Sequence, residues 1–88
     1  MKSKAIYNKL YTLAESLEIK IIKGKGNFKG GSCVYKKENI IVLNHNKPIE
    51  DRIRNLVFSL LEFNLDSIEL ESKMQKLFEE YQYIKEHG

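Results

Sequence analysis

The sequence predicts an α+β fold with an N-terminal helix, a three-stranded antiparallel or mixed sheet and two C-terminal helices. Three observations support this prediction: apolar residues recur at helical spacing near both ends, β-branched segments occupy the middle, and glycine-rich or polar segments separate them. The 88 residues are 42% hydrophobic and 31% charged, a composition typical of a folded chain with one core. We therefore expect residues 1–88 to form a single domain, with the helices on one face of the sheet.

The first helix is expected over residues 3–18, with Ser3 as its N-cap. Its apolar stripe follows spacings of four, three and four residues, which place one side chain per turn on the same face. The members of that stripe are Ile6, Leu10, Leu13 and Leu17.

Three strands are expected over residues 19–23, 32–36 and 39–43, the last two forming a hairpin with a tight turn at residues 37–39. Alternation along the second strand places Cys33 and Tyr35 on one face, opposite Ser32 and Val34. The run Ile-Ile-Val-Leu at residues 40–43 is continuously apolar. It indicates a strand that is central in the sheet or covered on both faces.

Four glycines in residues 24–31 predict a flexible loop, to which Phe28 would be the apolar anchor. The spacing of these glycines matches neither the dinucleotide-binding nor the Walker pattern, and a strand rather than a helix should follow them. We therefore do not expect a nucleotide-binding loop.

The two C-terminal helices follow the only proline of the chain, Pro48, which is well tolerated in a first helical turn after an Asn46 or Lys47 cap. A polar break is expected at residues 64–67. The first helix is apolar nearly all round and the second is amphipathic with acidic flanks. Their apolar residues are Ile49, Ile53, Val57, Leu60 and Leu61 in the first, and Leu70, Met74, Leu77, Phe78, Tyr81 and Ile84 in the second.

A cytoplasmic location is expected, because a single cysteine excludes an internal disulfide and the N-terminus lacks the apolar run of a signal peptide. No apolar stretch approaches the roughly 20 residues that a membrane-spanning helix needs, so we expect no membrane partner. No cofactor is expected either. One cysteine and two distant histidines do not have the spacing of a zinc site, and no serine triad is recognisable.

The positive charge is concentrated in the first half of the chain. Residues 1–47 hold ten lysines against three acids, whereas residues 48–88 hold five basic and nine acidic residues. Lysines beside aromatic residues are typical of proteins that bind single-stranded nucleic acid, although the absence of arginine from this segment weakens the comparison. The candidate contacts to a partner or nucleic acid are Lys20, Lys23, Lys25, Phe28, Lys29, Lys36 and Lys37.

Cys33 is the only candidate nucleophile, and a catalytic thiol needs a neighbouring base, for which His45 is the one candidate near the hairpin. The alternative is that Cys33 is a small buried hydrophobic residue, the usual state of a free cysteine. Should the loop and the hairpin converge, a pocket would form from Gly30, Gly31, Cys33, Asn44 and His45.

Three segments resemble a family of small uncharacterised bacterial proteins over roughly residues 10–80: Gly-Gly-Ser-Cys at 30–33, the apolar strand ending in Asn44, and Pro-Ile-Glu at 48–50. This resemblance implies no activity. A more remote resemblance is to minimal zincin metallopeptidases, whose corresponding helix bears the HExxH motif. Phe58 and Glu62 stand where that motif has its zinc histidines, and Ser59 stands in place of the catalytic glutamate, so zinc hydrolysis is not implied.

The leading functional hypothesis is a binding domain rather than an enzyme, contacting a protein partner or its own copy through the last helix and the hairpin edge. The first alternative is a nucleic-acid-binding module that uses the lysines of residues 19–37. The second is a thiol-dependent enzyme that uses Cys33.

Overall fold

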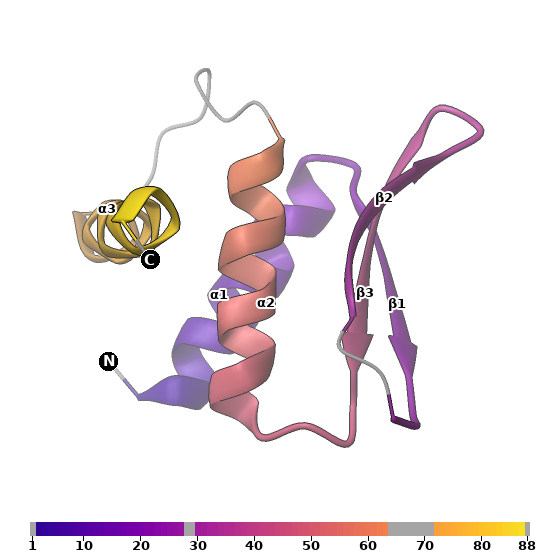
Figure 1. Ribbon diagram of the computed structural model, residues 1–88, viewed down its shortest axis with the longest axis horizontal. Coiled ribbons are helices and arrows are strands. Elements are labelled where there is room, and N and C mark those ends of the chain that lie inside the picture. The colour runs from indigo at the N-terminus through magenta and orange to yellow at the C-terminus, as the bar shows by residue number, and fades with distance from the viewer. Residues whose placement is uncertain (1, 28–29, 64–71, 88) are drawn as a thin grey trace.

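The computed structural model in Figure 1 describes residues 2–27, 30–63 and 72–87 and contains the predicted sequence of elements. Within these described residues, three helices and three strands follow one another as helix, strand, strand, strand, helix, helix, which confirms the predicted α+β fold class. They are α1 (Ser3–Ser16), β1 (Lys20–Gly24), β2 (Gly31–Tyr35), β3 (Glu38–Asn44), α2 (Ile49–Glu62) and α3 (Ser72–His87).

The sheet is mixed, with strand order β1-β3-β2. β1 runs parallel to β3, whereas β2 and β3 form an antiparallel hairpin in which Cys33 pairs with Ile40. β3 is therefore the central strand, which accounts for its apolar run. The parallel ends of β1 and β3 lie side by side at Gly24 and Asn44, and this edge of the sheet positions the candidate site.

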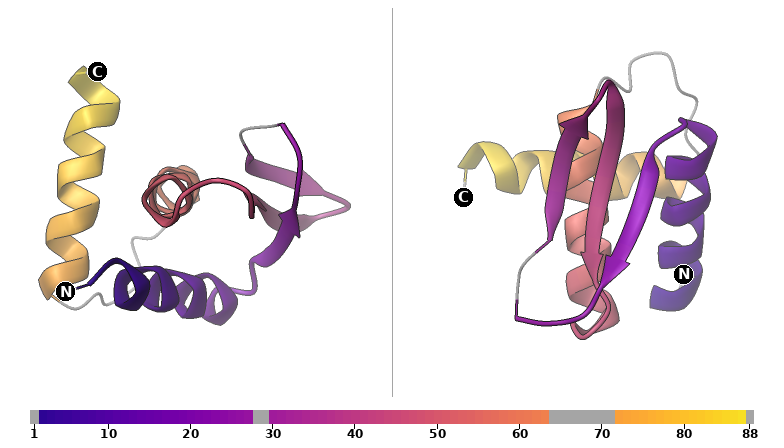
Figure 2. Two further views of the ribbon diagram at one scale, coloured as in Figure 1. Left: turned by 90° about the horizontal axis from the view of Figure 1, so that it is seen from below. Right: turned by 90° about the vertical axis from the view of Figure 1, so that its right-hand side faces the viewer.

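The two faces of the sheet differ because only one of them is covered by helices (Figure 2). Ile21, Ile41 and Leu43 point toward α1 and α2 and belong to the hydrophobic core. Alternation directs the intervening residues to the opposite side, where no described helix lies (Figure 2). We call this side the open face; it comprises Lys20, Ile22, Cys33, Tyr35, Glu38, Ile40 and Val42.

The core lies between the sheet and the helices. Leu10 and Ala14 of α1 and Leu56 of α2 have no exposed surface. Burying one leucine side chain contributes roughly 1.5–3 kcal/mol relative to exposure. α3 crosses α2 on the side remote from the sheet, so that α2 lies between α3 and the strands (Figure 2). Among the described helices, none has the length and apolar character needed to cross a bilayer.

Helix ends differ from the predictions by one to two residues. Lys2, not Ser3, occupies the N-cap position of α1 and makes no side-chain capping bond, and α1 ends at Ser16. The N-cap of α2 is Pro48 in extended conformation, rather than Asn46 or Lys47. Neither α1 nor α2 has a side-chain hydrogen bond at its N-cap, so no capping side chain fixes the residue at which either helix begins.

The hairpin turn also lies one residue earlier than predicted. Tyr35 pairs with Glu38, so Lys36 and Lys37 form a two-residue turn and Glu38 belongs to β3. Both turn residues have positive φ, 50° and 67° respectively, as a two-residue hairpin turn matching the twist of the strands requires. Asparagine and glycine normally occupy such positions, which is why a Lys-Lys pair did not predict the turn.

Some predictions fall on residues outside the described part of the chain. They concern the anchoring role of Phe28, the contact role of Lys29, the break at residues 64–67 and the place of Leu70 in the last helix.

Candidate functional site

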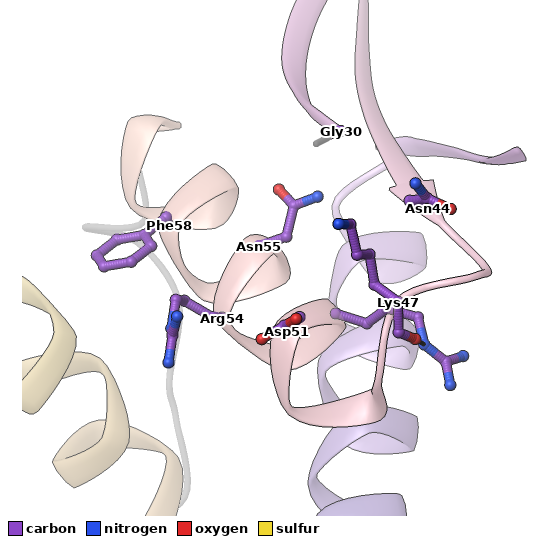
Figure 3. Close-up of a pocket in the computed structure, with 8 residues that line it drawn as sticks. Gly30, Asn44, Lys47, Asp51, Arg54, Asn55 and Phe58 are labelled. Carbon is purple, nitrogen blue, oxygen red and sulfur yellow. Dashed lines mark hydrogen bonds between the residues drawn. The ribbon is translucent and has the colours of Figure 1, made fainter. Parts of the chain in front are cut away.

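A cavity of about 400 Å³ opens at the edge of the sheet where β3 ends, between the start of β2 and the first half of α2 (Figure 3). This volume lies in the range of small-molecule sites. Most of the described residues that line it are of polar type, and they include three cations and one carboxylate: Gly30, Asn44, Lys47, Asp51, Arg52, Arg54, Asn55 and Phe58.

The wall of the cavity is fixed by Asn55 of α2. Its Nδ2 donates a hydrogen bond to the backbone carbonyl of Val42 at 3.1 Å, and its Oδ1 accepts one from the hydroxyl of Ser59 at 3.1 Å. Ser59 is buried one turn further along α2. The first bond joins the helix to the central strand, and the two together determine which way the Asn55 amide faces.

Gly30 closes against this wall so tightly that no other residue fits. A Cβ at this position would lie 2.4 Å from Asn55 Nδ2 and 2.5 Å from the carbonyl oxygen of Val42. The backbone of Gly30 also has a φ of +85°, which residues with a side chain rarely adopt. The glycine is therefore required both by its conformation and by the close approach of β2 to α2.

Asn44 holds the loops around the cavity and is 1% exposed. Its Nδ2 donates to the carbonyl of Gly26 at 2.8 Å, and its Oδ1 accepts from the backbone N–H of Asn46 at 2.9 Å. The backbone carbonyl of Asn44 also accepts a hydrogen bond from the backbone N–H of Lys47 at 3.1 Å. One buried amide thus connects the glycine-rich loop to the turn that presents Lys47.

The three cations have different environments. The Lys47 side chain is directed toward the space between Gly30 and Asn55, whereas Arg54 extends beside Phe58 (Figure 3). Arg52 is anchored instead, because its Nε donates to the carbonyl of Lys47 at 3.2 Å and its guanidinium lies 5.1 Å from the centroid of the Tyr7 ring.

The electrostatics of the cavity favour an anion. Three positive side chains outweigh the single carboxylate of Asp51, and the N-terminal end of α2 adds a partial positive charge nearby. Glu50 and Asp51 in the first turn of α2 offset part of that charge. The lining therefore combines attraction of an anion by three cations, one of them Lys47, with repulsion by Asp51.

Of the pocket predicted from the sequence, the structure brings together Gly30 and Asn44 but not Gly31, Cys33 or His45. Cys33 pairs with Ile40, and His45 follows the end of β3 five residues beyond Ile40. At about 3.3 Å per residue this separates them by about 16 Å along the strand, so they do not form a nucleophile and base pair.

The expectation that Cys33 is buried is wrong, because its thiol-bearing side chain is exposed. The reason is the alternation of β2. Ser32 faces α2, where its hydroxyl donates to the carboxylate of Glu62, and Cys33 consequently points to the open face.

The lysine segment divides between the two faces of the sheet. Lys23 lies on the helix-covered face, with its ammonium 4.9 Å from the centroid of the Tyr11 ring. Lys20 lies on the open face, Lys25 follows the end of β1, and Lys36 and Lys37 form the hairpin turn. Four of the predicted contacts therefore lie on or around the open face.

The positions compared with the zincin motif have structural partners of their own. The ring of Phe58 meets the Tyr81 ring edge-on at 5.2 Å, which joins α2 to α3. The carboxylate of Glu62 accepts a hydrogen bond from the hydroxyl of Ser32. Within residues 2–27, 30–63 and 72–87, no group of three histidine, cysteine, aspartate or glutamate side chains is arranged to hold a metal ion.

The residues that sequence reasoning missed lie on α2 and just before it. Lys47, Asp51, Arg54 and Asn55 were overlooked because the helix was assigned to the core. A signal did exist, since Asp51, Asn55 and Ser59 follow one another at four-residue spacing, which places three polar side chains in one row along the helix.

The surfaces expected to contact a protein partner are accessible. Tyr83 and Ile84 of α3 are 63% and 50% exposed, and β2 is an edge strand of the sheet. Association with a protein partner or a second copy stays a prediction. No family model, curated protein or solved structure matches the chain, so the two resemblances described above also stay predictions.

Proposed function

We propose that the protein is a binding domain that takes the anionic group of a ligand, a phosphate or carboxylate, into the cavity at the end of β3. The observation that supports this function is the combination of an excess of cations with a rigid polar wall. Lys47 provides the charge, and Asn44 and Asn55 are each held by at least two hydrogen bonds before any ligand arrives. Groups fixed in advance lose little conformational entropy on binding.

The first test is calorimetric titration with inorganic phosphate at low ionic strength, comparing the unaltered protein with Lys47→Met. Loss of a hydrogen bond to a charged group costs about 1.5–3 kcal/mol, so the variant should bind phosphate at least tenfold more weakly. Lys4→Met is the matched control. It removes the same charge from an exposed position of α1 and should leave the dissociation constant within twofold. Equal weakening in both variants would mean that phosphate responds only to net charge.

The second test reverses the sign of the effect. Asp51→Asn removes the one carboxylate that lines the cavity and should tighten phosphate binding roughly three- to tenfold, which corresponds to about 1 kcal/mol. Glu50→Gln changes the same charge in the same helical turn without lining the cavity, and it should have a smaller effect. If phosphate does not bind in the cavity, removing the Asp51 charge or the Glu50 charge should change its dissociation constant equally. Identical titrations for the two variants would therefore contradict the proposal.

A further inference from the structure

The described helices leave the open face of the sheet uncovered (Figure 2). This face presents apolar and aromatic side chains. Ile22 is 40% and Tyr35 62% exposed, and the register places the exposed Cys33 side chain between the rows that hold these two residues. Val42, paired with Ile22, is half-buried on the same side. The strands therefore form a shallow platform of one ring, two aliphatic side chains and a thiol, while Ile40 on the same side is buried.

The charge around this platform is positive. Lys20 lies on it, Lys25 follows the end of β1, and Lys36 and Lys37 lie at the hairpin turn. Against these four cations, the three strands contribute one acid, Glu38, at the base of the hairpin. An anionic partner with flat apolar groups fits this combination.

The hairpin turn provides a second and independent indication. Two lysines occupy adjacent positive-φ positions, where a side chain costs free energy that asparagine and glycine largely avoid. Strain of this kind is concentrated at functional positions. The Lys36 ammonium lies 5.4 Å from the centroid of the Tyr35 ring, so the strained turn keeps a cation beside the exposed aromatic side chain.

We infer that the open face binds single-stranded nucleic acid, with its phosphates on Lys20, Lys25, Lys36 and Lys37 and a base stacked on Tyr35. An unpaired base exposes the π-face that an aromatic side chain on a sheet can stack against, whereas a duplex conceals it. Lysine contacts to phosphate are independent of base sequence, so sequence preference should be weak. This inference uses other residues than the anion cavity and does not depend on it.

The test is fluorescence anisotropy with an end-labelled twelve-residue oligothymidylate, measured from 20 to 200 mM salt. Single-stranded binding has a log–log salt slope of about −0.7 per phosphate neutralised, so four lysines predict a slope of roughly −3. The double variant Lys36→Asn, Lys37→Gly should weaken binding at low salt and make the slope shallower by about 1.4. The control Lys2→Gln, Lys4→Gln removes the same charge from the N-terminal region and should leave the slope unchanged.

Stacking is tested separately with Tyr35→Leu. Removing a stacked aromatic side chain costs about 1–3 kcal/mol per base, so affinity should fall at least fivefold while the salt slope stays constant.

Three results would overturn the inference. The first is no anisotropy change at 20 mM salt, and the second is equal losses in the turn variant and its N-terminal control. The third concerns an acidic protein as the occupant. If polyglutamate of the same charge competes as well as the oligonucleotide and Tyr35→Leu has no effect, the face recognises acidic polypeptide instead.

Discussion

Gly30 determines at the scale of one residue whether the cavity keeps its shape. A Cβ at this position would meet the Asn55 amide and the Val42 carbonyl, two groups that are hydrogen-bonded to each other. Asn44 has the corresponding role on the opposite side, where its buried amide fixes the loop and the turn. The position of Lys47 thus depends on amide groups that need not touch the ligand.

Gly30→Ala should lower the free energy of unfolding by roughly 2–4 kcal/mol, because positive φ and the close approach of two heavy atoms both act against a Cβ. Gly31→Ala is the matched control. Its φ is +153°, yet nothing lies within 4 Å of a Cβ there, so only the backbone term applies, about 1 kcal/mol. Urea unfolding of the two variants measures the difference, and equal losses would show that the contact with Asn55 is unimportant.

These residues show what the sequence allowed to be predicted at the site. Gly30 and Asn44 were identified because a glycine-rich loop and a polar turn are visible as patterns. Asn55 was not, since a polar residue on an apolar helix shows its partner only after the helix is placed on the sheet. The sequence predicts the hairpin but not which residues pair in it, so Cys33 and His45 could be expected in the same pocket. In the observed register Cys33 pairs with Ile40, five residues or about 16 Å along the strand from His45.

At the scale of elements, the hairpin combines a regular ladder with an unfavourable turn. The two-residue connection fixes the register Tyr35 with Glu38, and that register places Cys33 and Tyr35 outside and Ser32 inside. The apolar run of β3 predicts a strand that is central or covered on both faces, and β3 is the central strand of the sheet. The apolar run does not predict that the described helices cover only one face of the sheet, because the residue pattern of a strand does not identify the elements that pack on each face.

Replacing the turn by Lys36→Asn and Lys37→Gly should stabilise the protein by roughly 1 kcal/mol, because both substituents accept positive φ. Lys36→Ala with Lys37→Ala removes the same two charges but keeps a Cβ at both positions, so no comparable gain is expected. Thermal and urea unfolding would distinguish them. Stabilisation by both pairs to the same extent would attribute the gain to charge removal, and the turn would then not be strained.

At the scale of the whole molecule, the lysines of the first half of the chain contribute to two separate basic surfaces. One is the cavity between α2 and the sheet edge, and the other is the open face with its hairpin turn. Composition predicted one domain with a positive half, and the periodicities predicted its elements in order. Neither could predict that Lys47 lines one cavity together with residues of α2, because that grouping arises only when β3 and α2 pack together.

The most direct test of the anion-binding function is a two-dimensional ¹H–¹⁵N NMR titration with inorganic phosphate. The proposal predicts saturable, one-to-one shifts of the side-chain amides of Asn44 and Asn55 and of the backbone amide of Gly30, with the same dissociation constant for all three. Shifts that stay linear to high phosphate, or that appear at Lys20 and Lys36 but not at these amides, would contradict it.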